Sequence, residues 1–150
     1  MIMLVLDIEA SGTEYQTHSI VSLGAIDLDN PERRFYEECR IWDGAHIMDG
    51  ALAVNGYTEA EITDPKKQTE AELIQRFMEW SQHIGNRTLV GQNVSFDRDF
   101  VHAACNRAGL PYDLAYRTLD THSLCYMHML KRGLTPPIDL QHRRSALNLD

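Results

Sequence analysis

The sequence has no long hydrophobic run and few of the features of an exported protein. No apolar stretch in its 150 residues approaches the roughly 18 residues that a membrane span needs. The amino-terminal segment lacks the basic flank and the small-residue cleavage site of a secretory signal. The three cysteines, Cys39, Cys105 and Cys125, form no Cys-x-x-Cys pair. We therefore expect a cytoplasmic protein with no membrane association and no disulfide.

Positive charge is also scarce. The 14 Lys and Arg residues against 22 Asp and Glu residues give a formal net charge of -8 at pH 7. A protein that coats nucleic acid nonspecifically depends on a surface of Lys and Arg, so the charge balance argues against that class. It does not exclude a nuclease, because an enzyme that grips only a chain end can offset phosphate charge with bound metal ions.

The first half of the chain has the pattern of strands, and its length suits one domain over residues 1–150. The apolar run Ile2–Leu6 predicts a buried strand that ends in acidic residues. Residues Ile20–Ile26 predict a second strand buried on both faces, and Arg34–Trp42 predict a third. Because the connections between them are short, we expect these three strands to form an antiparallel meander.

From Thr69 onward the apolar residues recur at helical spacing, with Thr69 and Glu72 suited to a capping box. Alternating short strands and helices follow, with strands expected near 88–91 and 117–120 and helices near 97–108 and 121–131. This order predicts an α/β fold with a mixed five-stranded sheet, antiparallel at first and parallel in its second half, flanked by helices.

The tripeptide Asp7-Ile8-Glu9 closes the first strand. Side chains alternate faces along a strand, so Asp7 and Glu9 point the same way. Two adjacent carboxylates repel one another unless a cation lies between them, and oxygen ligands suit Mg²⁺ or Mn²⁺. The pair therefore predicts a site for a hard divalent metal, against the alternative of two solvated surface charges.

A second acidic element, Gly91–Asp97, leaves a buried strand and places Asp97 at the start of a helix. Together, Asp7-x-Glu9 and Asn93-x-x-Phe96-Asp97 resemble the DnaQ-like family of 3′-to-5′ exonucleases, whose catalytic acids read Asp-Glu-Asp-Asp. Between them, the segment Val54–Thr58 resembles the family's Val-His-Gly-Ile-Thr run. Three motifs in the right order on the right elements are specific. The resemblance implies a ribonuclease H-like fold and a metal-dependent exonuclease.

The resemblance also assigns roles to residues. Two divalent ions, Mg²⁺ or Mn²⁺, would be bound by the three acids Asp7, Glu9 and Asp97, which would be both the metal ligands and the catalytic residues. The 3′ end of single-stranded DNA or RNA would lie against Ala10, Ser11, Gly12, Val54, Asn55, Gln92, Asn93 and Phe96. Some family members work as homodimers and one is a polymerase subunit, so the resemblance allows either kind of partner, although no feature of the sequence identifies the interface.

One part of the family pattern is absent. The family carries a histidine general base followed five residues later by a fourth Asp, whereas Leu147 stands five residues after His142. Ser145 could cap a further helix, yet the sequence ends at Asp150. We therefore expect the domain to be truncated before its last catalytic motif, and this chain to be inactive or impaired.

Other functions compete with this interpretation. A noncatalytic nucleic-acid-binding or scaffold module could keep the fold without the last motif. An endonuclease or integrase of ribonuclease H type would show a different acid pattern. That interpretation ranks last. Zinc at His122, Cys125 and His128 is also disfavoured, because these residues drift around one predicted helix and no second cluster completes the site.

Overall fold

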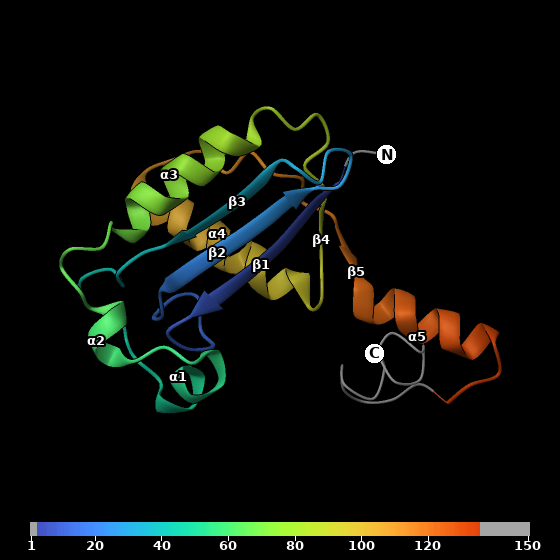
Figure 1. Ribbon diagram of the computed structural model, residues 1–150, viewed down its shortest axis with the longest axis horizontal. Helices are drawn as coiled ribbons and strands as arrows, with labels where there is room; N and C mark the ends of the chain where they lie inside the picture. Colours follow the sequence, from blue (N-terminus) through green and yellow to red (C-terminus); the bar gives the residue numbers. More distant parts are fainter. Residues whose placement is uncertain (1–2, 136–150) are drawn as a thin grey trace.

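The computed structural model describes residues 3–135 and contains one five-stranded sheet in the order β3-β2-β1-β4-β5 (Figure 1). The strands are β1 (Leu4–Ala10), β2 (Ile20–Asp27), β3 (Arg34–Glu38), β4 (Leu89–Gly91) and β5 (Thr118–Asp120). The first three strands pair antiparallel, and β4 and β5 are parallel to β1. The predicted mixed sheet is confirmed.

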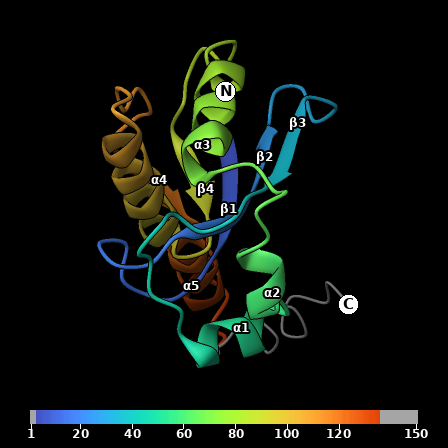
Figure 2. The same cartoon turned by 90° about the vertical axis from the view of Figure 1, so that its left-hand side faces the viewer.

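Five helices accompany the sheet within the described residues. They are α1 (Asp49–Asn55), α2 (Glu59–Ile62), α3 (Glu70–Ser81), α4 (Val94–Ala108) and α5 (Thr121–Lys131). In Figures 1 and 2, α1 and α2 lie together at one end of the molecule, near the carboxyl end of β1. In Figure 1, α5 lies apart from the sheet, beyond β5, and only Met129 of this helix is buried.

The core lies between the sheet and the two long helices. Alternate residues of β1, which are Leu4, Leu6, Ile8 and Ala10, belong to one buried cluster with residues of α3 and α4. The intervening residues, Asp7 among them, face away from this core because side chains alternate along a strand. The packing of α3 and α4 on one face therefore directs the acidic side chains to the other.

The predicted elements differ from the observed ones mainly at their ends. Helix α4 begins at Val94, earlier than expected, because Asn93 adopts a left-handed conformation with φ of 53° and turns the chain there. Strand β3 stops at Glu38, and only an isolated bridge between Arg40 and Thr69 follows it. The capping box of Thr69 and Glu72 is present as predicted.

Two expectations fall partly or wholly outside the described residues. The predicted cap at Ser145 and the residues around His142 lie in 136–150, as does the end of the chain.

No helix within residues 3–135 combines the length and apolar character needed to cross a bilayer. The cysteines at positions 39, 105 and 125 are free thiols.

Candidate active site

The three predicted acids lie close together where β1 extends beyond its neighbouring strand, β4. Strand β4 pairs with only the first two residues of β1, opposite Leu4 and Val5. Beyond that point the edge of β1 is taken by α4, where Asp97 Oδ1 accepts a hydrogen bond of 2.8 Å from the Ile8 N–H. Because Ile8 lies between Asp7 and Glu9, this bond fixes Asp97 beside the acid pair.

The pKa values of all three carboxyls are raised. Burial raises the pKa of Asp7, and burial together with the charge of Asp7 raises the pKa of Glu9. Burial is also the main reason that the pKa of Asp97 rises to about 7, opposed by the Ile8 hydrogen bond and assisted by the charges of Asp7 and Glu9. Three negative charges are therefore costly here without a cation.

The donor set fits a hard divalent ion in kind. All three groups are carboxylates, and none of them forms an ion pair with a lysine or arginine of the described residues. However, among residues 3–135 no three His, Cys, Asp or Glu side chains are already grouped as a metal site. His122, Cys125 and His128 likewise do not form a group of three potential metal ligands.

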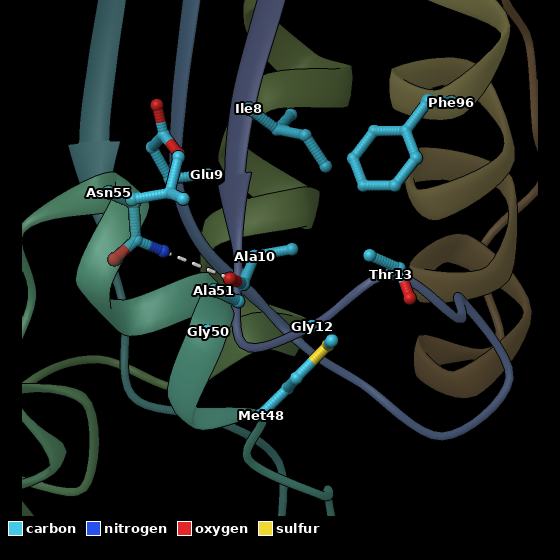
Figure 3. A pocket seen from close by; sticks show the side chains of 11 residues that line it. Ile8, Glu9, Ala10, Gly12, Thr13, Met48, Gly50, Ala51, Asn55 and Phe96 are labelled. Carbon is cyan, nitrogen blue, oxygen red and sulfur yellow. Dashed lines mark hydrogen bonds between the residues drawn. The ribbon is translucent and has the colours of Figure 1, made fainter.

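An apolar cavity of about 390 Å³ adjoins Glu9 (Figure 3). Its volume lies in the range of about 300–1,000 Å³ that is typical of small-ligand sites. The end of β1 and the following loop form one side of it, α1 forms another, and Phe96 of α4 closes a third. The lining residues are Ile8, Glu9, Ala10, Gly12, Thr13, Met48, Gly50, Ala51, Val54, Asn55 and Phe96.

A second cavity, of about 400 Å³, lies on the side of the acids that faces β2 and β3. It is more polar, and it shares Ile8, Glu9 and Asn55 with the first cavity. Its other lining residues are Asp7, Ser22, Gly24, Tyr36, Gly56, Tyr57 and Glu61. No lysine, arginine or histidine of the described chain lines either cavity. Glu9 therefore lies between the apolar cavity and the polar one.

Five of the residues predicted to contact substrate line the apolar cavity, and these are Ala10, Gly12, Val54, Asn55 and Phe96. Phe96 also packs on the buried Phe100, with ring centroids 4.8 Å apart. Its ring therefore contacts the core and lines the cavity as well. The other three residues do not line it.

Ser11 is fully buried; its Oγ donates to the His46 carbonyl and accepts from the Ser19 N–H. Gln92 and Asn93 are exposed in the turn before α4. Sequence reasoning missed Met48, Gly50 and Ala51, because α1 itself was not predicted. Thr13 is polar and exposed, and nothing in the sequence marks it as a cavity residue.

Gly12 has a packing reason that the sequence did not reveal. A Cβ atom at Gly12 would lie 2.0 Å from Cδ2 of His18, so the imidazole ring occupies the space that a side chain would need. His18 is nearly buried, and its Nδ1 accepts from the Glu14 N–H at 3.1 Å. The glycine thus lets the loop after β1 fold back over His18 and shape the cavity.

A protein-family model described as exonuclease, of the RNase T type, matches residues 4–136. The chain belongs to this exonuclease family. The match covers the acid pair, the α1 segment and Asp97 alike, so the expected family membership is confirmed.

Relatives of this exonuclease domain include larger enzymes. It is 27% identical over 134 residues to the PolC-type DNA polymerase III of Listeria welshimeri, covering 87% of this chain and 9% of that protein. It is 26% identical over 140 residues to ribonuclease T of Klebsiella pneumoniae, covering 81% of this chain and 63% of that protein. The chain thus spans less than two thirds of the length of either relative.

Solved structures of exonuclease I share its fold. The complex of the E. coli enzyme with a 5cy-dA13 oligonucleotide aligns with a TM-score of 0.77 at 19% identity, over 97% of this chain and 36% of that one. A product-bound structure of exonuclease I aligns with a TM-score of 0.74 at 18% identity, over 97% and 38%. A zinc-bound form of the E. coli enzyme with single-stranded DNA aligns at 0.71, over 87% and 30%. The ribonuclease H-like fold is therefore confirmed.

Proposed function

We propose that this exonuclease domain removes nucleotides from the 3′ ends of single-stranded DNA or RNA with the help of divalent Mg²⁺ or Mn²⁺. The observation that carries the proposal is the position of Glu9, which lines the apolar cavity while belonging to the cluster of three acids. A terminal nucleotide in the cavity would place its phosphodiester beside carboxylates. That arrangement suits hydrolysis of the last bond in a chain.

The cavity supports binding of any terminal base. Its surface is mostly apolar, with Phe96, Met48 and Val54 offering an aromatic ring and aliphatic groups. Stacking and apolar contact tolerate every base, since all bases have a flat π face. Among the described residues that line the cavity, the polar side chains are Glu9, Thr13 and Asn55, and so small a set agrees with an enzyme that trims regardless of sequence.

The acids would bind the metal and orient the reaction. Asp7 and Glu9 present carboxylates from one face of β1, and Asp97 adds a third carboxylate, whose Oδ1 accepts from the Ile8 N–H. A divalent ion bound to them would activate water and stabilise the leaving oxygen. The raised pKa of Asp97, about 7, means that metal must compete with a proton near neutral pH. Metal binding should therefore weaken as the pH falls below 7.

We expect the 150-residue chain to cut slowly. None of its seven histidines is followed by an aspartate five residues later, so the family's general base and fourth acid have no counterpart in this sequence. General base catalysis contributes about 100- to 10,000-fold to a rate. The test of function must therefore detect nucleotide binding as well as cleavage.

The experiment is digestion of 5′-labelled single-stranded DNA and RNA with Mn²⁺ or EDTA, paired with calorimetric binding of thymidine 5′-monophosphate. We expect a Mn²⁺-dependent ladder that shortens from the 3′ end, and nucleotide binding that requires Mn²⁺. Asp7→Ala should reduce both by about 100-fold or more. Asp113→Asn is the matched control, because Asp113 pairs with Arg87 away from either cavity. Internal cuts, or no binding by the folded wild type, would contradict the proposal.

A noncatalytic binding module is the second candidate. The absence of a preformed three-ligand metal group among residues 3–135 favours it. It predicts that oligonucleotides bind with equal strength in Mn²⁺ and in EDTA, and that no ladder forms. Metal-dependent binding would exclude it.

A further inference from the structure

Helix α1 is a cavity wall with little to hold it in place. None of its seven residues is buried, and Met48 caps its start without a side-chain hydrogen bond. Val54 is 88% exposed although it lines the cavity. An isolated helix this short is unstable in water. The position of α1 must therefore depend on contacts at its two ends.

Both ends of α1 are attached to the residues that close β1. At its start, the Met48 N–H donates to the Ser11 carbonyl at 2.8 Å. At its end, Asn55 Nδ2 donates to the Ala10 carbonyl at 3.0 Å, as Figure 3 shows. Asn55 is thus the only side chain of α1 for which the described structure gives a hydrogen bond to β1.

The partner of Asn55 lies at an irregularity of the sheet. Glu9 pairs with Ser22, but Ala10 pairs with Ile20, so Val21 is an extra residue and the register shifts between Glu9 and Ala10. Bulges of this kind locally disrupt the hydrogen-bond ladder and re-aim nearby side chains. The bond from Asn55 therefore meets β1 immediately after Glu9, at the point where the strand departs from regular pairing.

The oxygen of the Asn55 side-chain amide is also hydrogen-bonded. Its Oδ1 accepts a hydrogen bond of 3.2 Å from the Tyr57 N–H, which orders the turn after α1. The side chain also borders both cavities next to Glu9. With Nδ2 bound to Ala10 and Oδ1 bound to Tyr57, the amide is oriented by backbone partners on two segments.

We propose that Asn55 is a positioning residue, which holds the α1 wall against the end of β1 and so keeps the cavity shaped for a terminal nucleotide. This inference rests on the proposed exonuclease function for its consequence but not for its geometry. In this role Asn55 affects substrate binding indirectly, by bonding to the Ala10 carbonyl and holding α1 in place. The sequence had instead predicted a direct contact between Asn55 and the substrate. Its loss should weaken nucleotide binding and raise KM while leaving kcat nearly unchanged.

Two variants test the geometry independently of activity. Asn55→Ala removes both hydrogen bonds, whereas Asn55→Asp keeps the acceptor for Tyr57, replaces the donor to Ala10 by an acceptor and adds a negative charge. By amide hydrogen exchange, both should speed exchange at Leu52 and Gly56 about fivefold, while α3 amides stay unchanged. Asn86→Ala is the matched control, since Asn86 Oδ1 accepts from Thr88, the residue before β4. Exchange in α1 that matches the wild type in both variants would overturn the proposal.

Nucleotide binding then tests the consequence. With Mn²⁺, Asn55→Ala should bind thymidine 5′-monophosphate about fivefold more weakly, a factor equal to about 1 kcal/mol and to the usual net worth of one hydrogen bond. In the ladder assay its KM should rise by a similar factor and kcat should change less than twofold. Weaker binding with unaltered exchange would mean that Asn55 contacts the nucleotide directly, which overturns the positioning role. If the wild type binds no nucleotide, the exonuclease proposal fails, and the exchange data alone decide the role of Asn55.

Discussion

At the scale of one residue, opposing effects set the pKa of the Asp97 carboxyl. Only 4% of its surface is exposed, and burial outweighs the stabilising hydrogen bond from Ile8. In the unfolded chain an aspartate has a pKa of about 3.9, whereas the folded pKa is about 7. Between these values the folded protein retains a proton that the unfolded chain has lost. The free energy of unfolding must therefore decrease as pH rises through this window.

Replacing Asp97 by Asn should remove this dependence. In EDTA, Asp97→Asn should match the wild type near pH 4 and exceed its free energy of unfolding by about 2–4 kcal/mol at pH 8, because each unit of pKa shift is worth about 1.4 kcal/mol. The amide oxygen can still accept from Ile8. Urea unfolding across this pH range measures the difference. Wild-type and variant curves that stay parallel from pH 4 to pH 8 would contradict the assigned pKa.

Gly12 makes a second prediction at the residue scale. In Gly12→Ala the new methyl group overlaps the His18 ring, which is nearly buried, so the variant should lose about 1–3 kcal/mol of unfolding free energy. In a background of His18→Ala the same change should cost much less, which a double-mutant cycle would detect. Gly50→Ala is the control, because only the Met48 methyl group comes as near as 4.0 Å. Additive effects of the two changes would show that the ring is not the obstacle.

At the scale of elements, one buried carboxylate joins three of them. Glu70 of α3 accepts from Ser19 Oγ and from the Ile20 N–H at the start of β2, and it pairs with Arg107 of α4 at 2.9 Å. Only 2% of its surface is exposed. Removing the charge of Glu70 would leave Arg107, whose side chain is 25% exposed, hydrogen-bonded to the Tyr15 carbonyl but without its carboxylate partner.

Glu70→Gln should therefore destabilise the domain by about 1–3 kcal/mol, less than for a fully buried pair because Arg107 is partly exposed. Arg107→Leu in addition should recover part of this loss, since no guanidinium without a carboxylate partner then remains. Thermal and urea unfolding of the four members of the cycle provide the measurement. Glu79→Gln, on the exposed side of α3 next to Gln75, is the control and should change little. A Glu70→Gln variant as stable as this control would refute the assigned role.

The elements also show what the sequence could and could not predict. Alternation on a strand placed Asp7 and Glu9 on one face correctly, and helical spacing located α3, because each pattern reflects burial against a single core. Helix α1 buries nothing, so no apolar period marks it in the sequence. Its cavity residues, such as Met48, were missed for that reason. The link from Asn55 to Ala10 spans 45 positions and depends on a sheet irregularity that composition does not encode.

At the scale of the whole molecule, charge and topology act together. Helices α3 and α4 cover one face of the sheet, and the side chain of Asp7 points to the opposite face. The chain carries a formal charge of -8, and no cationic side chain of residues 3–135 lines either cavity. If the domain acts on nucleic acid as proposed, phosphate groups beyond the scissile one would meet no cationic side chain of residues 3–135 in either cavity. Attraction to nucleic acid should come from the metal and from stacking on the last base.

This distribution predicts binding with weak dependence on salt and on length. Each phosphate neutralised by Lys or Arg contributes about -0.7 to the slope of log K against log salt for single strands, so a site that holds one phosphate gives a slope of about -1 or smaller in magnitude. With Mn²⁺ fixed, a dinucleotide and a 20-nucleotide strand should bind almost equally per end. Fluorescence titration across KCl concentrations measures both. Asp49→Lys, which adds a cation at the exposed start of α1, should steepen the slope. A wild-type slope near -3 would instead require several cationic contacts, which neither described cavity contains.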